Sequence, residues 1–562
     1  MSDETGPARA GDDAPAAAPS AAEAPAETSG ATPAGSVPAA GGGLTRRALL
    51  VGVGAAGGAG AMFAAMGALG LVPESQDRDF APPQRSDFSL TGRAAAKVVV
   101  LGAGVAGLTC AYELGKAGYD CTVLEASGRI GGRNLTLRAG DRLDELGGET
   151  QTAEFQEGVY FNAGAARIAA WMVTMDYCRE LGVPVEIFVN NNASAYVYTR
   201  GMAAPARARA ARADLYGYVA ELLAKSSHAG ALDRRLTADD RERLEEFLRR
   251  FGDLGPDLSY RRDSRRRGFE TYPGVGEGVS VGTASSLRDV LAAGTGRYVT
   301  MDFGYDQVMP MFQPVGGMDT ITDALADAVG RGRIRTGVPV TGVRNLPDGV
   351  EVTHRDGTGS GVVRADYCVA TLPPHLFARL PHNLGAPVTA ALRTPVPVSA
   401  GKIGLEYGRR WWEIDDRIYG GASETDLDIT HIWYPSYGFH SRGGLVVGYY
   451  NTEENADAYT GLSHRERRNR ALTQGKKIHG EKYRAELRSS VSIAWGRQPY
   501  IEGGWASWPS FGSDYALLQR PAGRVHFAGD WLSHLTAWQA GAMESARRAV
   551  TDLHRRVLQA TS

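Results

Sequence analysis

The chain has 562 residues and is almost neutral, with 61 lysines and arginines against 63 aspartates and glutamates. This balance excludes the strongly basic surface on which nucleic-acid binding depends. The four cysteines are too few for a disulfide scaffold and do not have the spacing of a zinc site, so we predict no bound metal. Hydrophobic residues make up 43% and charged residues 22% of the chain, as in ordinary globular proteins of several folding units.

The N-terminal 96 residues are expected to serve targeting. Residues 1–43 consist mainly of small residues and proline, without any aromatic side chain, and are expected to form a disordered tail. Residues 44–72 start with LTRRALL and continue as an uncharged run rich in Gly and Ala, which resembles a twin-arginine export signal. Because residues 48–72 are long enough to span a bilayer, an uncleaved membrane anchor is the alternative. With 73–96 as a linker, we predict a protein exported, to the cell envelope or beyond, through the twin-arginine translocation machinery.

The folded part opens with the pattern of a dinucleotide-binding unit. Residues 97–101 are an aliphatic run, GAGVAG follows at 102–107 before a helical pattern, and a second aliphatic run at 121–124 ends on an acid. In such a unit the glycines allow a tight turn, the approach of backbone to a pyrophosphate, and close packing of helix on strand. The acid holds a ribose diol and disfavours a 2′-phosphate. The cofactor-binding residues predicted here are Gly102, Gly104, Val105, Ala106, Gly107, Glu125 and Ala126.

A second glycine-rich turn and a C-terminal strand indicate which dinucleotide is bound. GRIGGR at 128–133 follows the acid, and RVHFAGD at 524–530 reads as a strand that ends before a helix at about 538–558. With these motifs the sequence resembles the flavin-dependent amine oxidase superfamily from about residue 95 to 558. The resemblance implies FAD, and the N-terminus of the last helix would stabilise negative charge on reduced flavin. The further cofactor-binding residues that it implies are Arg133, Gly164, Arg167, Val340, Gly529, Asp530, Ala537, Trp538, Gln539, Ala540, Gly541 and Ala542.

The cysteines bear on how the cofactor is held. Some amine oxidases tether flavin through a cysteine near the C-terminus, whereas this chain has no cysteine after Cys368. We therefore expect non-covalent FAD. Cys110, Cys121, Cys178 and Cys368 fall on expected helices or strands, so core packing is expected for all four.

The middle of the chain indicates a branch of the superfamily. YFNAGAAR at 160–167 resembles the L-amino acid oxidase motif whose arginine grips the substrate carboxylate, and a guanidinium makes a bidentate fork with a carboxylate. We expect Arg167 to precede a helix over 168–181; an ordinary surface arginine is the alternative. GLVVGYY at 444–450 resembles the strand that supplies a tyrosine hydroxyl to the same carboxylate. Tyr449 matches better than Tyr450, but a one-residue slip would exchange them.

Two further residues are expected beside the flavin. AGKIGL at 400–405 resembles the stretch in which a lysine faces flavin N5 through a water, which makes Lys402 the predicted catalytic residue. A surface lysine on an edge strand is the alternative. Trp538 is expected to form one wall of an aromatic substrate slot, or else to be a core tryptophan.

The resemblance implies an α/β (α+β) fold, with a discontinuous Rossmann-like FAD-binding domain, a mixed-sheet substrate domain and a helical insert. A turn at 314–319 would return the chain to the FAD domain, followed by a helix over 321–329 and a small β-meander within 338–370. A basic run at 261–267 is expected to be a solvated loop. The expected segments are the FAD-binding domain at 97–165, 309–375 and 515–562, a helical and substrate-domain segment at 166–308, and the substrate-binding domain at 376–514.

The function that this resemblance implies is oxidative deamination of an L-amino acid by FAD, with O₂ as oxidant and a 2-oxo acid, ammonia and hydrogen peroxide as products. One alternative is a monoamine or polyamine oxidase or a tryptophan-2-monooxygenase-like enzyme; Arg167 counts against the amine substrates. Another is a membrane-tethered flavoprotein dehydrogenase that passes electrons to a partner. The sequence leaves the preferred side chain and the oligomeric state open, although dimers are common in the superfamily.

Overall fold

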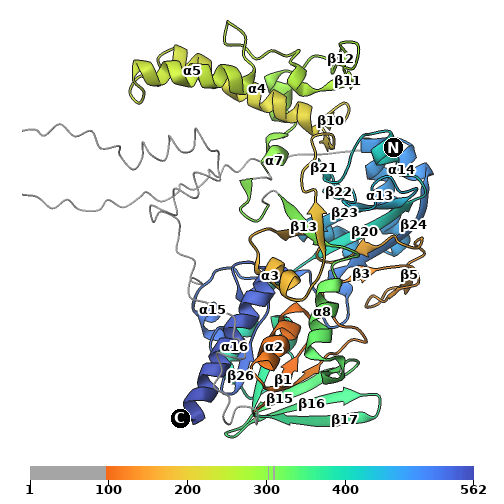
Figure 1. Ribbon diagram of the computed structural model, residues 1–562, viewed down its shortest axis with the longest axis vertical. Coiled ribbons are helices and arrows are strands. Elements are labelled where there is room, and N and C mark those ends of the chain that lie inside the picture. The colour runs from red at the N-terminus through yellow and green to blue at the C-terminus, as the bar shows by residue number, and fades with distance from the viewer. Residues whose placement is uncertain (1–95, 301–302, 308–309, 562) are drawn as a thin grey trace, which may run out of the picture. The chain divides into compact units, whose positions relative to one another are not determined.

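The computed structural model describes residues 96–300, 303–307 and 310–561 (Figure 1). The expected tail at 1–43, the export signal or anchor at 44–72, and the linker up to residue 95 lie outside the described residues. Among the helices that are described, none combines the length and the apolar character needed to cross a membrane.

A five-stranded parallel sheet carries the expected dinucleotide-binding unit. Its order is β14 (Ile334–Arg335), β2 (Asp120–Leu124), β1 (Lys97–Leu101), β18 (Tyr367–Ala370) and β26 (Val525–Phe527). Every neighbouring pair is parallel. The strands come from distant parts of the chain, and the strands predicted at 97–101 and 121–124 and before Gly529 are confirmed. The mixed α/β class is confirmed with them.

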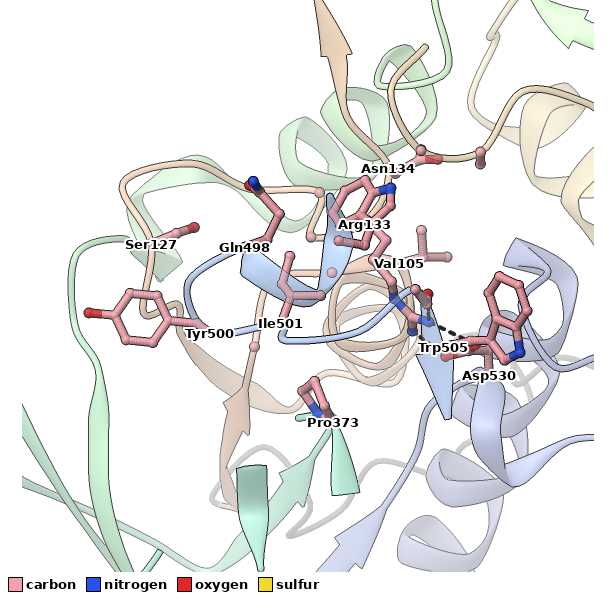
Figure 2. Close-up of a pocket in the computed structure, with 18 of the residues that line it drawn as sticks. Val105, Ser127, Arg133, Asn134, Pro373, Gln498, Tyr500, Ile501, Trp505 and Asp530 are labelled. Atoms are coloured by element: carbon pink, nitrogen blue, oxygen red, sulfur yellow. Dashed lines mark hydrogen bonds and ion pairs between the residues drawn. The ribbon is translucent and has the colours of Figure 1, made fainter. Parts of the chain in front are cut away.

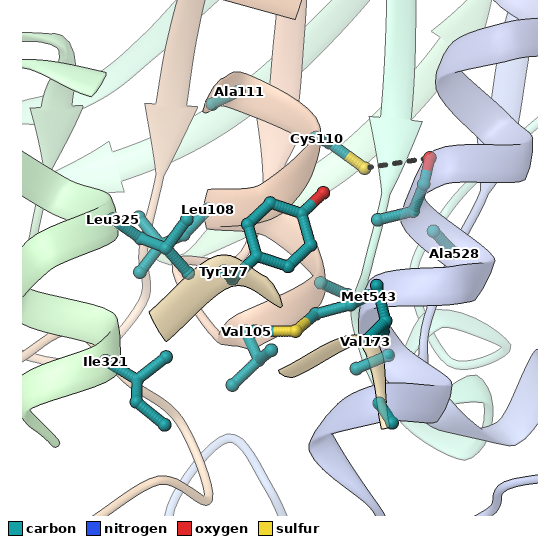
Figure 3. Packing of buried hydrophobic residues seen from close by; sticks show 14 of the residues in the cluster. Val105, Leu108, Cys110, Ala111, Val173, Tyr177, Ile321, Leu325, Ala528 and Met543 are labelled. Carbon is teal, nitrogen blue, oxygen red and sulfur yellow. Dashed lines mark hydrogen bonds between the residues drawn. The ribbon is translucent and has the colours of Figure 1, made fainter. Parts of the chain in front are cut away.

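Alternate side chains of β1 enter two separate cores, as the two-residue period of a strand requires. Val98 and Val100 pack with α2 (Val105–Lys116), α8 (Thr320–Val329) and α16 (Gln539–Thr561). Figure 3 shows Leu108, Leu325 and Met543 of these helices gathered around Tyr177.

Val99 and Leu101 pack on the other face of the sheet. That face is covered by an antiparallel meander and by short helices of the same cluster. These elements are β15 (Val340–Asn345), β16 (Val350–Asp356), β17 (Gly359–Ala365), α9 (Pro374–Phe377), α10 (Ala386–Leu392) and α15 (Ser513–Leu518). A parallel sheet is covered on both faces in this way, and the predicted meander is confirmed.

The second large sheet is mixed and has seven strands. Its order is β10 (Ala206–Arg207), β9 (Tyr196–Tyr198), β21 (Ala422–Thr425), β22 (His431–Trp433), β23 (Gly444–Thr452), β20 (Ala400–Tyr407) and β24 (Leu487–Ala494). One face packs against helices of the following segments, which supply Trp411, Tyr459 and Tyr483 to a fully buried aromatic core. The helices are α11 (Trp411–Ile414), α12 (Glu453–Thr460), α13 (His464–His479) and α14 (Lys482–Ala485). The opposite face packs in part on a core around Leu135 and Phe161 and also carries Lys402 of the site.

The helix expected over 168–181 is wrong in its first part. Residues 168 and 169 form a strand, β7 (Ile168–Ala169), which pairs with β13 (Met311–Pro314), and β13 pairs in turn with β8 (Val185–Phe188). Helix α3 (Val173–Glu180) begins only after this strand. Both residues of β7 are fully buried, so pairing and burial override the helical pattern and hold Arg167 at the end of a small sheet.

The remaining elements are short or belong to the insert. In the insert α4 (Ala208–His228) packs along α5 (Ala238–Gly252) (Figure 1). The others are β3 (Thr136–Leu137), β4 (Arg142–Leu143), β5 (Gln151–Thr152), β6 (Phe161–Asn162), β11 (Phe269–Thr271), β12 (Val279–Ser280), β19 (Val396–Val398), β25 (Trp505–Ser507), α6 (Leu287–Ala292), α7 (Gly296–Val299) and the 3₁₀ turns η3 (Arg265–Arg267), η5 (Arg331–Arg333), η6 (Trp495–Arg497) and η7 (Asp530–Leu532).

The basic run and the four cysteines can be compared with their predictions. The basic run at 261–267 is not wholly a solvated loop, because Arg267 is buried and forms an ion pair of 2.8 Å with the equally buried Asp214. A buried cation of this kind needs such a partner. The four cysteines are free and buried, as predicted.

Candidate active site

A cavity of about 680 Å³ opens above the carboxyl ends of β1 and β2 (Figure 2). Its walls come from the loop between β1 and α2, the turn at 127–134, the segment 498–501 and the start of α16. Ligands of open parallel sheets bind at this end of the strands, and the volume falls within the range of ligand pockets.

The glycines of the first loop have distinct roles. Gly102 has φ +98°, which favours glycine, and a Cβ on Gly107 would lie 1.9 Å from the carbonyl oxygen of Gly102. Gly107 therefore allows helix and strand to pack. A Cβ on Gly104 would meet nothing within 4 Å, and Gly104, Val105 and Ala106 line the cavity.

The N-terminus of α2 is available to an anionic ligand. Its N-cap residue, Gly104, offers no side-chain cap, so no capping side chain takes up the first amide groups of the helix. Free amides and the positive end of the helix dipole favour a phosphate.

Glu125 joins the two glycine-rich turns. One carboxylate oxygen accepts a bond of 2.8 Å from the backbone N–H of Ala103, and the other accepts bonds of 2.8 Å from the N–H and the hydroxyl of Ser127. Glu125 and Ala126 both line the cavity, as predicted. The acid is thus held in place by backbone at the position where a ribose is expected.

Arg133 and Asp530 form a two-pronged ion pair in the cavity wall (Figure 2). Arg133 also donates to the carbonyl of Gly504 at 2.9 Å, and Asp530 accepts the N–H of Ala537 at 3.0 Å. Asp530 is only 3% exposed. The pair therefore holds the turn after β2 against the approach to α16.

Some residues at the start of α16 line the cavity, and others pack against the turn that precedes the helix. Ala537, which has φ +68°, Trp538, Gln539 and Ala542 line the cavity, together with Gly164 and Gly529. Ala540 and Gly541 do not line it. A Cβ on Gly541 would lie 2.2 Å from the carbonyl oxygen of Leu535, so these two small residues allow the helix to start close to the preceding turn.

Val340, whose backbone the resemblance places at the adenine, does not line the cavity. It pairs with His354 in the meander, and its side chain packs on the core behind the sheet. Two residues just before Val340 bond to the turn that follows β2. The backbone N–H of Gly337 donates to the carbonyl of Ser127, and that of Val338 donates to the carbonyl of Glu125.

One wall of the cavity was not predicted. The segment around Tyr500, which has φ +63°, lines it with aromatic and polar side chains (Figure 2). The glycine pair before Trp505 was the available signal in the sequence. The residues concerned are Trp495, Gln498, Pro499, Tyr500, Ile501 and Trp505.

A second cavity of about 60 Å³ shares Lys402 and Tyr450 with the first. The chain at 164–167 runs along both, because Gly164 lines the larger cavity and Arg167 the smaller one. The other walls of the smaller cavity include five aromatic residues: Tyr160, Phe188, Trp433, Tyr434 and Tyr437.

The guanidinium of Arg167 has aromatic neighbours and one neutral partner. It lies 5.0 Å from the ring of Trp433 and 5.6 Å from the ring of Trp538. It donates from Nη2 to the side-chain oxygen of Gln307 at 3.0 Å, whereas Nε is shielded from solvent and has no hydrogen-bond partner in the described residues. Desolvation lowers the pKa of Arg167. Within the described part of the chain it forms no ion pair with a carboxylate, so this cation is suited to receive an anion.

Lys402 is buried on an interior strand, because β20 lies between β23 and β24. The alternative of a surface lysine on an edge strand is therefore wrong. Its Nζ donates to the carbonyls of Asn162 and Gly164, and lies 4.7 Å from the ring centre of Tyr450. Burial, and then the charge of Arg167, lowers the pKa of Lys402 from 10.5 to about 7.

The tyrosine predicted beside the carboxylate must be corrected from Tyr449 to Tyr450. The pairing of β20 with β23 shifts between Ile403 and Gly404, leaving Gly448 without a partner in a β-bulge. The extra residue reverses the alternation: Tyr449 pairs with Ile403 and enters the aromatic core, while Tyr450 pairs with Lys402 and lines both cavities.

The fold and the larger cavity are suited to a dinucleotide, and comparison with known proteins gives the family. The profile of the family described as flavin containing amine oxidoreductase matches residues 105–554. The chain belongs to this family and carries a flavin cofactor. The larger cavity fits such a group. It brings together the uncapped N-terminus of α2, free space beside Gly104 and the start of α16.

Individual relatives are more distant. The chain is 29% identical over 476 residues to the L-amino-acid oxidase of Siganus canaliculatus, covering 82% of this chain and 86% of that protein. It is 30% identical over 493 residues to the flavin-dependent L-tryptophan oxidase RebO of Lentzea aerocolonigenes, covering 81% and 97%. Cyclohexylamine oxidase from Brevibacterium oxydans IH-35A superimposes with a TM-score of 0.57 at 18% identity, covering 82% and 99%, which shows a shared fold.

Proposed function

We propose that the protein is an L-amino acid oxidase that binds FAD non-covalently and converts an L-amino acid, O₂ and water into a 2-oxo acid, ammonia and hydrogen peroxide. The observation that carries the proposal is Arg167, a guanidinium that forms no ion pair with a carboxylate among the described residues and lines the cavity next to Lys402 and Tyr450. The L-amino-acid and L-tryptophan oxidases named above support it. Bound FAD supplies the two-electron acceptor and passes the electrons to O₂.

Arg167 and Tyr450 hold the substrate carboxylate in this proposal. The guanidinium offers a fork of N–H donors, and its Nε has no partner among the residues that the structure describes. Burial raises the pKa of Tyr450, so its hydroxyl stays protonated at neutral pH and can donate. Two donors on one carboxylate fix the orientation of the neighbouring α-carbon, and orientation supplies a large part of catalytic rates.

Lys402 controls a proton at the boundary between the two cavities. With a pKa of about 7, its Nζ is present in both the charged and the neutral form near neutrality. In the neutral form it can accept a proton from a water or from the substrate ammonium, which must lose a proton before the amine is oxidised. Its bonds to the carbonyls of Asn162 and Gly164 hold Nζ at the cavity wall.

The smaller cavity is the proposed site of the substrate side chain. Tyr160 and Tyr437 stack in its wall with ring centres 4.1 Å apart, and Leu445 and Val447 are aliphatic neighbours. Its 60 Å³ corresponds to room for about four to six waters by this measure. Burial of an apolar side chain is favourable. The expected substrates are therefore amino acids with apolar side chains of medium size.

We also propose that residues 44–72 direct export through the twin-arginine machinery, because LTRRALL precedes an uncharged run. Replacing both arginines with lysine in a fusion to a reporter that is active only after export should abolish reporter activity. Export of the Lys-Lys variant at the normal level would contradict this. A homodimer stays an expectation from the family resemblance, and light scattering of the purified protein tests it.

A panel of the twenty L-amino acids tests the proposed activity directly. Peroxide and 2-oxo acid should form in equal amounts with apolar L-amino acids, and acid precipitation should release yellow FAD into the supernatant. Formation of an amide instead of a 2-oxo acid would identify a monooxygenase. Flavin that is reduced by the amino acid but reoxidised slowly by air would identify a dehydrogenase.

A further inference from the structure

A short segment of the insert lies against the carboxylate-binding arginine. In residues 303–307 a turn is closed by a bond of 2.9 Å from the N–H of Gln307 to the carbonyl of Gly304. Two adjacent side chains of the turn bond to residues of the site: Gln307 accepts a bond from Arg167, and Asp306 accepts a bond of 3.2 Å from the indole N–H of Trp538.

Further contacts hold this turn in place. The indole of Trp171 donates to the carbonyl of Tyr305 at 3.2 Å, and the two rings lie 6.0 Å apart. Asn190 donates to the same oxygen of Gln307 that accepts from Arg167, at 3.4 Å. Gln307 is therefore held by bonds from two donors and by its own backbone turn.

The chemistry of Gln307 resembles that of the proposed substrate group. Its side-chain oxygen is a planar sp² acceptor, as each oxygen of a carboxylate is, but it carries no net charge. It accepts one N–H of Nη2, the nitrogen that supplies one N–H to each fork of a guanidinium, Nε–Nη2 and Nη1–Nη2. A bidentate carboxylate needs both N–H groups of one fork, so a carboxylate that takes the fork used by Gln307 must replace the amide oxygen.

We propose that Gln307 is an internal competitor for the carboxylate site, so that an amino acid binds to Arg167 by displacing the Gln307 amide. This inference rests on the proposed function and adds a residue that sets substrate affinity. A neutral amide satisfies part of the guanidinium's need for an acceptor yet remains weaker than a charged carboxylate, because charge-assisted bonds are about twice as strong as neutral ones.

Two substitutions of Gln307 should change affinity in opposite directions. The probe is 3-phenylpropanoate, a carboxylate without an α-amino group, and its binding to the FAD-loaded protein is measured by calorimetry. Gln307→Ala removes the competitor and should tighten binding about 10-fold. Gln307→Glu supplies a permanent carboxylate to Arg167 and should weaken binding by about 100-fold or more.

Two controls separate competition from a loosened turn. Phe303→Ala alters a side chain of the same segment that is 76% exposed, and it should leave the affinity for 3-phenylpropanoate unchanged. 2-Phenylethylamine lacks the carboxylate, so its affinity should be the same in wild type and in Gln307→Ala. Circular dichroism and the melting temperature verify that each variant is folded.

The outcomes distinguish this inference from the function on which it rests. If wild type binds 3-phenylpropanoate and Gln307→Ala binds it equally or more weakly, Gln307 is a fellow ligand of the substrate, and the inference is overturned while the proposed function stands. If neither wild type nor any variant binds the carboxylate, the carboxylate site itself is wrong and both fall.

Discussion

The two cavities are built in different ways. The larger one is shaped mainly by backbone: positive-φ glycines, two helix starts and an acid held by amide groups. The smaller one is shaped by side chains that converge from β20, β23 and the end of β7, and its arginine bonds to a turn of the insert. A backbone-built site follows from a local motif, whereas a side-chain-built site depends on strand register and on distant segments.

The backbone character of the larger cavity predicts the largest mutational effect. Gly107→Ala would place a Cβ 1.9 Å from the carbonyl oxygen of Gly102, where only a backbone shift can relieve the clash. We expect destabilisation on the order of 4 kcal/mol or more and loss of bound flavin, measured by urea unfolding and by absorbance.

Gly104→Ala is the matched control for this prediction, because its Cβ has open space. The variant should unfold at the same urea concentration as wild type when both lack FAD, but it should bind FAD weakly, since the Cβ points to the pyrophosphate position. Equal destabilisation by the two variants would show that the cavity is not shaped in the way described.

Arg167 tests the side-chain-built cavity. Arg167→Ala should lower kcat/KM for L-phenylalanine by about 1000-fold, because a charged bidentate contact is lost, while the flavin content stays normal. Arg167→Lys retains the charge but not the fork, and should recover only a small part of the activity. Full activity of the lysine variant would argue against bidentate binding.

The bulge in β23 gives a prediction that separates two adjacent tyrosines. Tyr450→Phe should raise KM for L-phenylalanine about 10-fold or more, the usual effect of losing one hydrogen bond to a charged group. Tyr449→Phe changes a core residue that is 0% exposed, and should leave KM unchanged. The reverse result would restore the unbulged register.

The smallest expected effect is a change in stability on replacing Lys402. Because its pKa is about 7 in the folded chain instead of 10.5, the unfolded chain binds more protons between these values, and stability rises with pH across this window. Lys402→Met should therefore raise the melting temperature by several degrees at pH 6. The gain should shrink as the pH approaches 10, which scanning calorimetry with excess FAD would measure; a gain that does not depend on pH would exclude a depressed pKa.

The same contrast explains what could be predicted from the sequence. The strand, glycine loop, helix and acid at 97–125 are local, and all were placed correctly, since the positive φ of Gly102 and the close contact at Gly107 arise within the loop itself. The resemblance favours Tyr449 over Tyr450, and a bulge at Gly448 cannot be seen in one strand alone. The helix expected from residue 168 gave way to pairing with β13, which lies more than a hundred residues away. Gln307 has no motif, and only the folded chain places it on Arg167.

The most direct test of the central claim compares two substrates that differ only in the carboxylate. If Arg167 holds an acid group beside the flavin, peroxide release should show a kcat/KM for L-phenylalanine about 1000-fold above that for 2-phenylethylamine. Equal or faster oxidation of 2-phenylethylamine would contradict the account, because Arg167 would then have no part in substrate binding.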